Sequence, residues 1–336
     1  MRKLGKQTAE LPSRPRITSS AAVVGKREGE GPLKSYFDRV SDDSYFGEKT
    51  WEKAEVRMLQ DSFALACGKG GIAPEAIDCV ISGDLLNQCI SSSFAMKDEG
   101  IPYLGVYGAC STMAEALVLA GILVDGGFAR YACAMTGSHF CTAERQYRFP
   151  LEYGGQRPPT SQWTVTGAGA AIVSHAETGA ALSHITIGQI VDAGIDDANN
   201  MGAAMAPAAY ETLKAHFADT HRAPEDYDAI FTGDLGAQGH DLLVDLFARD
   251  GVHLGARYMD CGVLIYDLRA QDVHSGGSGC GCGASVLCAH ILPAMQRGVW
   301  RRVLFAATGA LMSPTSSQQG ESIPGICHAV ALEISE

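Results

Sequence analysis

The segment ACSTMAEALVLAGILVDGGFARYACAMTG (Ala109–Gly137) recurs later in the chain, without a gap, as GCGASVLCAHILPAMQRGVWRRVLFAATG (Gly281–Gly309). Both copies begin at a small-residue turn with a cysteine, continue with the apolar spacing of a buried helix, and end in a β-type run. The alignment pairs Cys110 with Cys282, Gly126 with Gly298, Arg130 with Arg302, and Thr136-Gly137 with Thr308-Gly309. We therefore expect two equivalent helix–strand units.

A second pair of segments supports a duplication. DCVISGDLLNQ (Asp78–Gln88) matches DAIFTGDLGAQ (Asp228–Gln238) in its first Asp, its Gly-Asp-Leu and its final Gln. Because both pairs occur in the same order and each joins strand to helix character, they predict an α/β fold of two similar βαβ-rich halves. Chance similarity between two βα units is the alternative.

Cys110 stands at the start of the first buried helix of this repeat. The N-terminal end of a helix carries partial positive charge and free N–H groups, which favour a thiolate. The question is whether this thiol acts as a nucleophile or is what remains of a site that once did covalent chemistry.

The composition limits the possible partners. The chain of 336 residues is 46% hydrophobic and 19% charged, with a net charge of −12 that disfavours nucleic acid and anionic lipid. Its longest apolar runs, such as ALVLAGILV, are about half the length that crosses a bilayer. The eleven cysteines lie in apolar or Gly-rich runs and no signal peptide is evident, so we expect reduced thiols in a cytosol-like compartment.

Several segments have a clear local character. Residues 1–20 are basic and contain two prolines, so we expect a loose arm that leads into a first strand near Ala21–Gly25. Residues 50–71 predict an amphipathic helix with a glycine stop, and residues 76–88 predict a buried strand followed by a turn. The Gly/Ala-rich run Thr164–Ser174 predicts a closely packed central strand, since no phosphate-loop fingerprint leads into a helix there.

Three longer phrases resemble the stage V sporulation protein AD family, which belongs to the thiolase and β-ketoacyl synthase superfamily. They are GKREGEGPL (Gly25–Leu33), TAERQYRFPLEYGGQRPPTSQWTVTGAGAA (Thr142–Ala171) and GESIPGICHAVALE (Gly320–Glu333). The resemblance extends over essentially the whole chain. It implies a thiolase-like duplicated fold with mixed five-stranded sheets around buried helices, divided into residues 21–175 and residues 176–336.

The same resemblance implies a role. Members of this family occur in endospore formers, bind dipicolinic acid (pyridine-2,6-dicarboxylic acid), and help move it into the developing spore alongside membrane proteins of the same operon. We therefore expect a binding protein without a cofactor that forms a homodimer and is held at the forespore membrane by its partners. The ligand is expected either free or as its calcium chelate.

Condensing enzymes of the superfamily combine their cysteine with two further groups, usually His with Asn or a second His, which stabilise a developing oxyanion. Here the histidine position falls on Asp234, with His240 the nearest histidine, and the asparagine position falls around Cys280. Because a carboxylate would repel the oxyanion, we expect no condensing activity. The alternative function is an acyltransferase in which His328 acts as the base for Cys110. His328 can also be interpreted as a neutral histidine of the core.

A dicarboxylate ligand needs cationic or N–H donors for its carboxylates and a flat face for its ring. Arg145, Arg148 and Arg157 cluster among aromatic residues, so we expect at least one of them to bind a carboxylate. Pairing of each arginine with a neighbouring acidic side chain is the alternative. The full set of candidate ligand-binding residues is Cys110, Ser138, His139, Arg145, Arg148, Arg157, Trp163, Cys282 and His328.

Two further patterns have structural interpretations. Asp84 and Asp234 occupy equivalent turns, and we expect them to cap the helices that follow, with calcium coordination by Asp234 as an alternative. The CGCG run at 280–283 places two thiols one residue apart without a second Cys/His pair nearby, which makes a poor zinc site. Its glycines are expected to let the two pseudo-symmetric helices approach closely.

Overall fold

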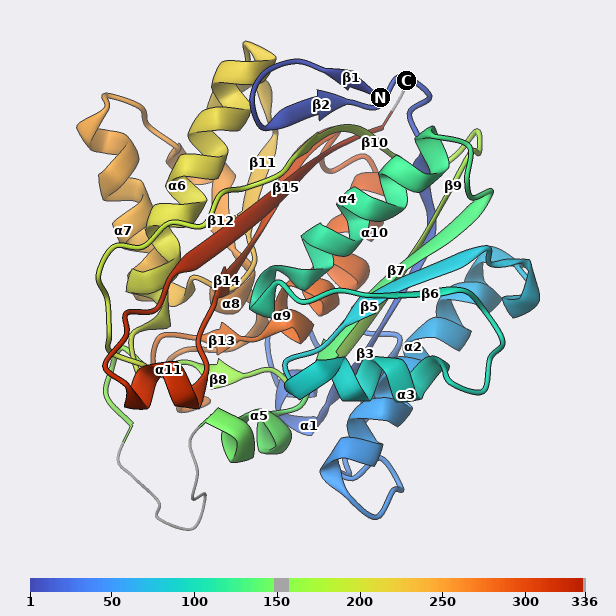
Figure 1. The fold of residues 1–336 in the computed structure, drawn as a ribbon, viewed down its shortest axis with the longest axis horizontal. Coiled ribbons are helices and arrows are strands. Elements are labelled where there is room, and N and C mark those ends of the chain that lie inside the picture. Colours follow the sequence, from blue (N-terminus) through green and yellow to red (C-terminus); the bar gives the residue numbers. More distant parts are fainter. Residues whose placement is uncertain (148–156, 335–336) are drawn as a thin grey trace.

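The computed structural model describes residues 1–147 and 157–334 (Figure 1). Its strands are β1 (Arg2–Lys3), β2 (Thr8–Glu10), β3 (Arg16–Gly25), β4 (Arg39–Ser41), β5 (Cys79–Gly83), β6 (Tyr103–Gly105), β7 (Tyr131–Ser138), β8 (Trp163–Thr164), β9 (Gly167–Ser174), β10 (Ala180–Thr186), β11 (Ala229–Thr232), β12 (Tyr258–Asp260), β13 (Gly277–Ser278), β14 (Arg302–Ala310) and β15 (Gly325–Glu333). Its α-helices are α1 (Lys26–Gly29), α2 (Trp51–Gly70), α3 (Ile90–Met96), α4 (Thr112–Asp125), α5 (Phe140–Tyr147), α6 (Met201–Thr220), α7 (Gly236–Arg249), α8 (Cys261–Ile265), α9 (Cys280–Val286), α10 (Leu292–Gln296) and α11 (Pro314–Gln318).

The strands form two rows with the same pattern. The order is β6-β5-β7-β9-β3 in the N-terminal half and β12-β11-β14-β15-β10 in the C-terminal half. In each row the first three strands are parallel and the last two pairings are antiparallel. The rows join where Ile17 of β3 pairs with Ala180 of β10. The predicted duplicated fold is confirmed, and its two mixed five-stranded rows, the N-terminal and the C-terminal sheet, join edge to edge into one continuous sheet.

Equivalent aspartates fasten equivalent strands in the two halves. One carboxylate oxygen of Asp78, just before β5, accepts the backbone N–H groups of Arg130 and Tyr131. Asp228, just before β11, does the same for the N–H groups of Arg301 and Arg302. The sequence repeat therefore preserves a specific hydrogen-bonding device as well as a hydrophobic pattern.

The prediction of a loose arm over residues 1–20 is wrong. β1 pairs with β2, β2 pairs with β10, and β3 begins at Arg16 rather than near Ala21. Thr8 and Leu11 are fully buried, and the Thr8 hydroxyl bonds that of Thr186 in β10. The few apolar and β-branched side chains of this segment therefore outweigh its charge and its prolines.

The helices form three layers around the two sheets (Figure 1). α4 and the helix made of α9, a π-helical turn (Leu287–Ile291) and α10 lie in the main buried core. α2 packs on the N-terminal sheet in a second core, and α6 and α7 pack on the C-terminal sheet in a third. The predicted helix over residues 50–71 is confirmed as α2, which Thr50 caps at its start and Gly71, at φ 61°, ends.

Glycines bring α9 against the strands rather than against α4, so the predicted helix–helix explanation of CGCG is wrong. A Cβ on Gly281 would lie 2.2 Å from the carbonyl oxygen of Gly167 and 2.7 Å from Ser138 Oγ. A Cβ on Gly169 would lie 2.5 Å from the carbonyl oxygen of Ala284. β9 is thus the closely packed central strand that residues 164–174 predicted, preceded by the short β8.

We expect Gly281→Ala to lower the free energy of unfolding by about 2–3 kcal/mol, because the added methyl meets backbone that cannot move aside. Urea denaturation followed by circular dichroism under reducing conditions measures this. Gly68→Ala in α2 is the matched control, since its Cβ meets nothing within 4 Å and alanine favours the helix by about 1 kcal/mol. Equal unfolding midpoints for Gly281→Ala and the unchanged protein would contradict the packing argument.

Candidate functional site

Cys110 lies in a tight turn that leads into the buried helix α4. The turn spans Ala109–Ser111, and Ala109 has a φ of 49°, which is uncommon for a residue with a side chain. The hydroxyl of Ser111 donates to the carbonyl of Gly108, and that of Thr112 donates to Ala109, each at 2.7 Å. These bonds hold the half-buried thiol in a fixed place at the end of the helix.

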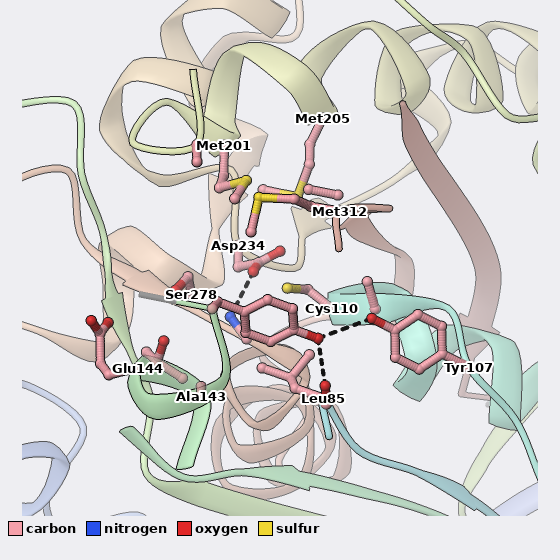
Figure 2. Close-up of a pocket in the computed structure, with 16 residues that line it drawn as sticks. Leu85, Tyr107, Cys110, Ala143, Glu144, Met201, Met205, Asp234, Ser278 and Met312 are labelled. Carbon is pink, nitrogen blue, oxygen red and sulfur yellow. Dashed lines mark hydrogen bonds between the residues drawn. The ribbon is translucent and has the colours of Figure 1, made fainter. Parts of the chain in front are cut away.

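The thiol opens into a cavity between the two halves (Figure 2). The cavity has a volume of about 80 Å³. This leaves room for several water molecules. Thioether, phenol and small apolar side chains make up most of the wall, and Glu144 and Asp234 are its acidic members. Among the described residues that line it there is no lysine, arginine or histidine.

Asp234 faces Cys110 from the C-terminal half (Figure 2). Its carboxylate accepts the Gly279 N–H at 2.8 Å and the Thr308 hydroxyl at 3.0 Å. Burial raises the pKa of Asp234 to about 7, against its ordinary value of 3.8. The carboxyl group therefore carries a proton for much of the time near neutral pH.

The expectation that the start of the helix favours a thiolate at Cys110 is wrong. Burial, followed by the charge of Asp234, raises the pKa of the Cys110 thiol well above its ordinary value of 9.0. Desolvation and a facing carboxyl group together exceed the attraction of the helix end. The resting state of Cys110 is the protonated thiol.

The two equivalent aspartates differ in what they bind. Asp84 accepts the N–H groups of Leu86 and Ser92, so its predicted capping of the following helix is confirmed. Asp234 does not cap α7. That task belongs to Asp260, which accepts the N–H groups of Leu235 and Gly236. Because Asp260 caps α7, the carboxyl group of Asp234 is left to face the cavity.

Neither His328, the candidate base for Cys110, nor His240, the histidine nearest to Asp234 in the sequence, lines this cavity. Nδ1 of His328, on β15, accepts the Gly188 N–H at 3.2 Å, and burial lowers the pKa of His328 to about 4. His240, on α7, stacks on Tyr258 with ring centroids 4.6 Å apart and contacts Asp241. His328 is thus a neutral, hydrogen-bonded histidine of the sheet.

Three other candidate ligand residues have structural partners. The Ser138 hydroxyl donates to the carbonyl of Val165 and accepts the Gly281 N–H. His139 contacts the carbonyl of Ser44 through Nε2 at 2.8 Å, and the Cys282 thiol donates to the carbonyl of Gly233. None of the three lines the cavity, although all come from segments that border it.

The arginine cluster is only partly visible, because Arg148 lies outside the described residues. Arg145 forms an ion pair with Glu52 and lies over the Trp51 ring. Arg157 donates to the carbonyl of Asp272 at 2.9 Å and lies over Trp163, which also stacks on Phe140. Arg145 and Arg157 are therefore paired with acidic residues, as the alternative interpretation of these side chains predicted. Neither of them lines the cavity.

Sequence reasoning missed the apolar wall of the cavity. Met201 and Met205 project from the first turns of α6, and Met312 comes from the segment after β14 (Figure 2). The spacing of Met201 and Met205 places them on one helix face, which was a usable signal. Tyr107, directly before the Cys110 turn, was also missed.

The sequence is similar to those of known proteins over nearly its whole length. Residues 5–333 match the family model described as stage V sporulation protein AD. The chain is 44% identical over 333 residues to stage V sporulation protein AD of Bacillus subtilis (strain 168), covering 99% of this chain and 98% of that protein. None of the helices in residues 1–147 and 157–334 combines the length and apolarity that crossing a bilayer requires.

Two solved structures show the fold class. 3-oxoacyl-(acyl-carrier-protein) synthase III from Aquifex aeolicus VF5 has 14% identity and a TM-score of 0.59, over 95% of this chain and 100% of that chain. Cerulenin-bound OleA from Xanthomonas campestris has 14% identity and a TM-score of 0.63, over 99% of each chain. At such identities the likeness concerns the fold alone, and it confirms the predicted thiolase-like class.

Proposed function

This chain belongs to the stage V sporulation protein AD family, and we propose that it binds dipicolinic acid, without covalent chemistry, in the cavity between Cys110 and Asp234. In this role it presents the compound to membrane proteins of the sporulating cell for uptake into the forespore. One observation carries the proposal. The fold keeps a cavity at the end of α4, and the thiol in it is protonated and faces an acid.

The apolar walls of the cavity can hold a flat ring, and its polar groups fit a ligand that carries no net charge. The thioethers of Met201 and Met205 provide polarisable apolar contacts. Protonated Asp234 and the hydroxyls of Thr164 and Ser278 are available as donors to carboxylates. Since the described wall has no cationic side chain, the calcium chelate, which is neutral, fits it better than the bare dianion.

Calorimetric titration with dipicolinate, with and without calcium, tests the proposal directly. We expect saturable binding, stronger with calcium, and a loss of at least about ten-fold in affinity for Ala198→Trp, whose indole would occupy the cavity that Ala198 borders. Circular dichroism establishes that each variant is folded. Folded protein that binds dipicolinate in neither condition would refute the proposal.

The Arg145→Ala variant tests whether the ligand binds in the cavity or at the arginine cluster. Because Arg145 pairs with Glu52 outside the cavity wall, we expect this variant to bind within about two-fold of the unchanged protein. A ten-fold loss would instead assign the ligand to the arginine cluster that the sequence suggested.

An acyltransferase that uses Cys110 is the second candidate, since the position of the thiol at the end of α4 is that of a nucleophile. The high pKa of Cys110 argues against it. After incubation with acyl-CoA we expect no acyl adduct in the intact mass. An adduct that appears in the unchanged protein and disappears in Cys110→Ser would establish covalent chemistry.

The remaining parts of the proposal concern assembly. We propose a homodimer that contacts membrane proteins of the same operon and so stays at the forespore membrane, without a cofactor of its own. The family relationship supports this. Sedimentation velocity of the purified chain and fractionation of sporulating cells are the corresponding measurements, and a monomer recovered only away from membranes would contradict it.

A further inference from the structure

A second, outer cavity lies directly beside the one that holds Cys110. Its volume is about 380 Å³, and it is bordered by exposed residues such as Asn87, Gln88 and Ser313. The inner cavity, in contrast, has buried residues such as Asp234 and Gly279 on its wall. The outer cavity is therefore the more exposed of the two.

Three side chains belong to both cavities and form the partition between them. They are Tyr107, Tyr147 and Met312, which come from the segment after β6, the end of α5 and the segment after β14. The hydroxyl groups of Tyr107 and Tyr147 are 3.1 Å apart and hydrogen-bonded, and the Tyr147 hydroxyl also donates to the carbonyl of Leu85 (Figure 2). The partition thus consists of side chains from separate segments, linked by hydrogen bonds.

The partition has the properties of a movable element. Tyr107 is 44% exposed, and its hydroxyl bonds only Tyr147 among the described residues, so rotation of its ring costs one hydrogen bond and little buried surface. Tyr147, by contrast, is anchored to Leu85. Side chains of this exposure change rotamer far faster than ligands dissociate.

We propose that the outer cavity is the entry chamber for the ligand and that the hydrogen-bonded pair Tyr107–Tyr147 is the gate to the inner cavity. The identity of the ligand rests on the proposed function, whereas the gate itself does not. The hydroxyl groups bond each other in the closed state, so they control access and leave recognition to the inner walls. Opening then governs association and dissociation alike.

Alkylation of Cys110 by iodoacetamide tests the gate without dipicolinate. The reagent must reach the thiol, and peptide mass spectrometry reports the rate at each cysteine separately. We expect Tyr107→Phe to accelerate the labelling of Cys110 about five-fold, since one hydrogen bond no longer holds the closed state. Tyr147→Phe, which also releases the carbonyl of Leu85, should accelerate it at least as much.

Two controls isolate this effect. Cys141 is also partly exposed and lines neither cavity, so its labelling rate should stay constant in every variant. Tyr36→Phe removes a hydroxyl from a tyrosine of similar exposure, 40%, outside both cavities and should leave Cys110 unchanged. Unchanged labelling of Cys110 in both gate variants would overturn the gate.

Stopped-flow binding of dipicolinate supplies the second readout. A gate predicts that Tyr107→Phe raises the association and dissociation rates together and leaves Kd within about two-fold. A slower association or a large change in Kd would show that the hydroxyl contacts the ligand instead, and would overturn the gate. Faster labelling of Cys110 in a protein that does not bind dipicolinate would keep the gate and refute the proposed ligand.

Discussion

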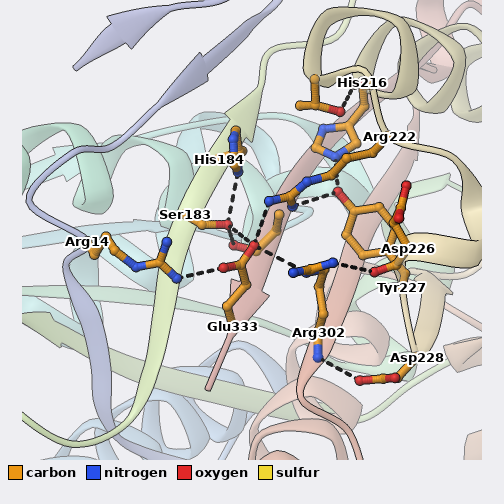
Figure 3. Close-up of polar contacts among 12 residues, drawn as sticks. Arg14, Ser183, His184, His216, Arg222, Asp226, Tyr227, Asp228, Arg302 and Glu333 are labelled. Carbon is orange, nitrogen blue, oxygen red and sulfur yellow. Dashed lines mark hydrogen bonds and ion pairs between the residues drawn. The ribbon is translucent and has the colours of Figure 1, made fainter. Parts of the chain in front are cut away.

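Glu333→Gln is expected to lower the free energy of unfolding by about 2–3 kcal/mol near neutral pH. Glu333, at the end of β15, is the common partner of three arginines that come from different parts of the chain (Figure 3). Its carboxylate oxygens lie 2.6 Å from Arg14, 2.9 Å from Arg222 and 3.5 Å from Arg302. Its side chain is 12% exposed, but those of the arginines are more exposed, which limits the cost.

The effect of Glu333 should depend on pH in a defined direction. Although burial opposes it, the arginines Arg14 and Arg222 lower the pKa of Glu333 to about 2, against an ordinary 4.5. Because the pKa of Glu333 is lower in the folded state than in the unfolded state, the ionised carboxylate stabilises the fold. This stabilisation is fully present above pH 4.5 and is lost as the pH falls towards 2. The difference between the unchanged protein and Glu333→Gln should therefore shrink to roughly half near pH 3.

Urea unfolding curves at neutral pH and near pH 3 measure this difference. Glu177→Gln, at an exposed loop position, is the matched control and should change stability by less than about 0.5 kcal/mol. A difference of the same size at both pH values would show that Glu333 stabilises the sheet through packing or neutral hydrogen bonds, such as the one from Ser183, rather than through its charge.

The repeat made the two equivalent halves predictable, because it carries the local pattern of each half. Ala109–Gly137 and Gly281–Gly309 each encode a buried helix and the strand after it, and such patterns depend on nearby residues. The N-terminal strands were not predictable in this way. β2 is only three residues long and owes its place to Thr186 of β10, a partner distant in sequence.

The site was less predictable than the fold for the same physical reason. Sequence reasoning placed Asp234 at the position where condensing enzymes carry the histidine that acts with the cysteine, and the structure brings Asp234 and Cys110 together. It could not assign partners to arginines, because Glu52 and Asp272 lie far from Arg145 and Arg157 along the chain. Nor could it weigh the desolvation of a thiol against a helix dipole, since burial depends on the whole fold.

Asp234→Asn is expected to strengthen dipicolinate binding roughly ten-fold near pH 8 and to remove most of its pH dependence. The pKa of buried Asp234 is about 7, so the carboxyl group is neutral below that value and charged above it. Dipicolinate is a dianion at neutral pH. Two like charges about 5 Å apart at an effective dielectric constant of about 20 repel each other by about 3 kcal/mol, so charged Asp234 opposes binding.

The unchanged protein should therefore bind the free ligand most strongly below about pH 7 and lose roughly ten-fold in affinity per unit well above it. Calcium should flatten this profile, because the chelate is neutral. Stability provides an independent readout. Since folding raises the pKa of Asp234 from 3.8 to about 7, its ionisation costs stability as the pH rises through this range, and Asp234→Asn should be the more stable protein near pH 8.

Asparagine can keep the local geometry, which makes the variant informative. Its Oδ1 accepts the Gly279 N–H, and its amide group donates to the Thr308 hydroxyl, which can turn to accept. Calorimetric titrations on either side of pH 7 then compare Asp234→Asn with Asp241→Asn, a change of an aspartate that is 82% exposed. If Asp234→Asn kept the pH profile of the unchanged protein, the group that titrates would have to be another one, and the carboxyl group facing Cys110 would have no part in recognising the charge of the ligand.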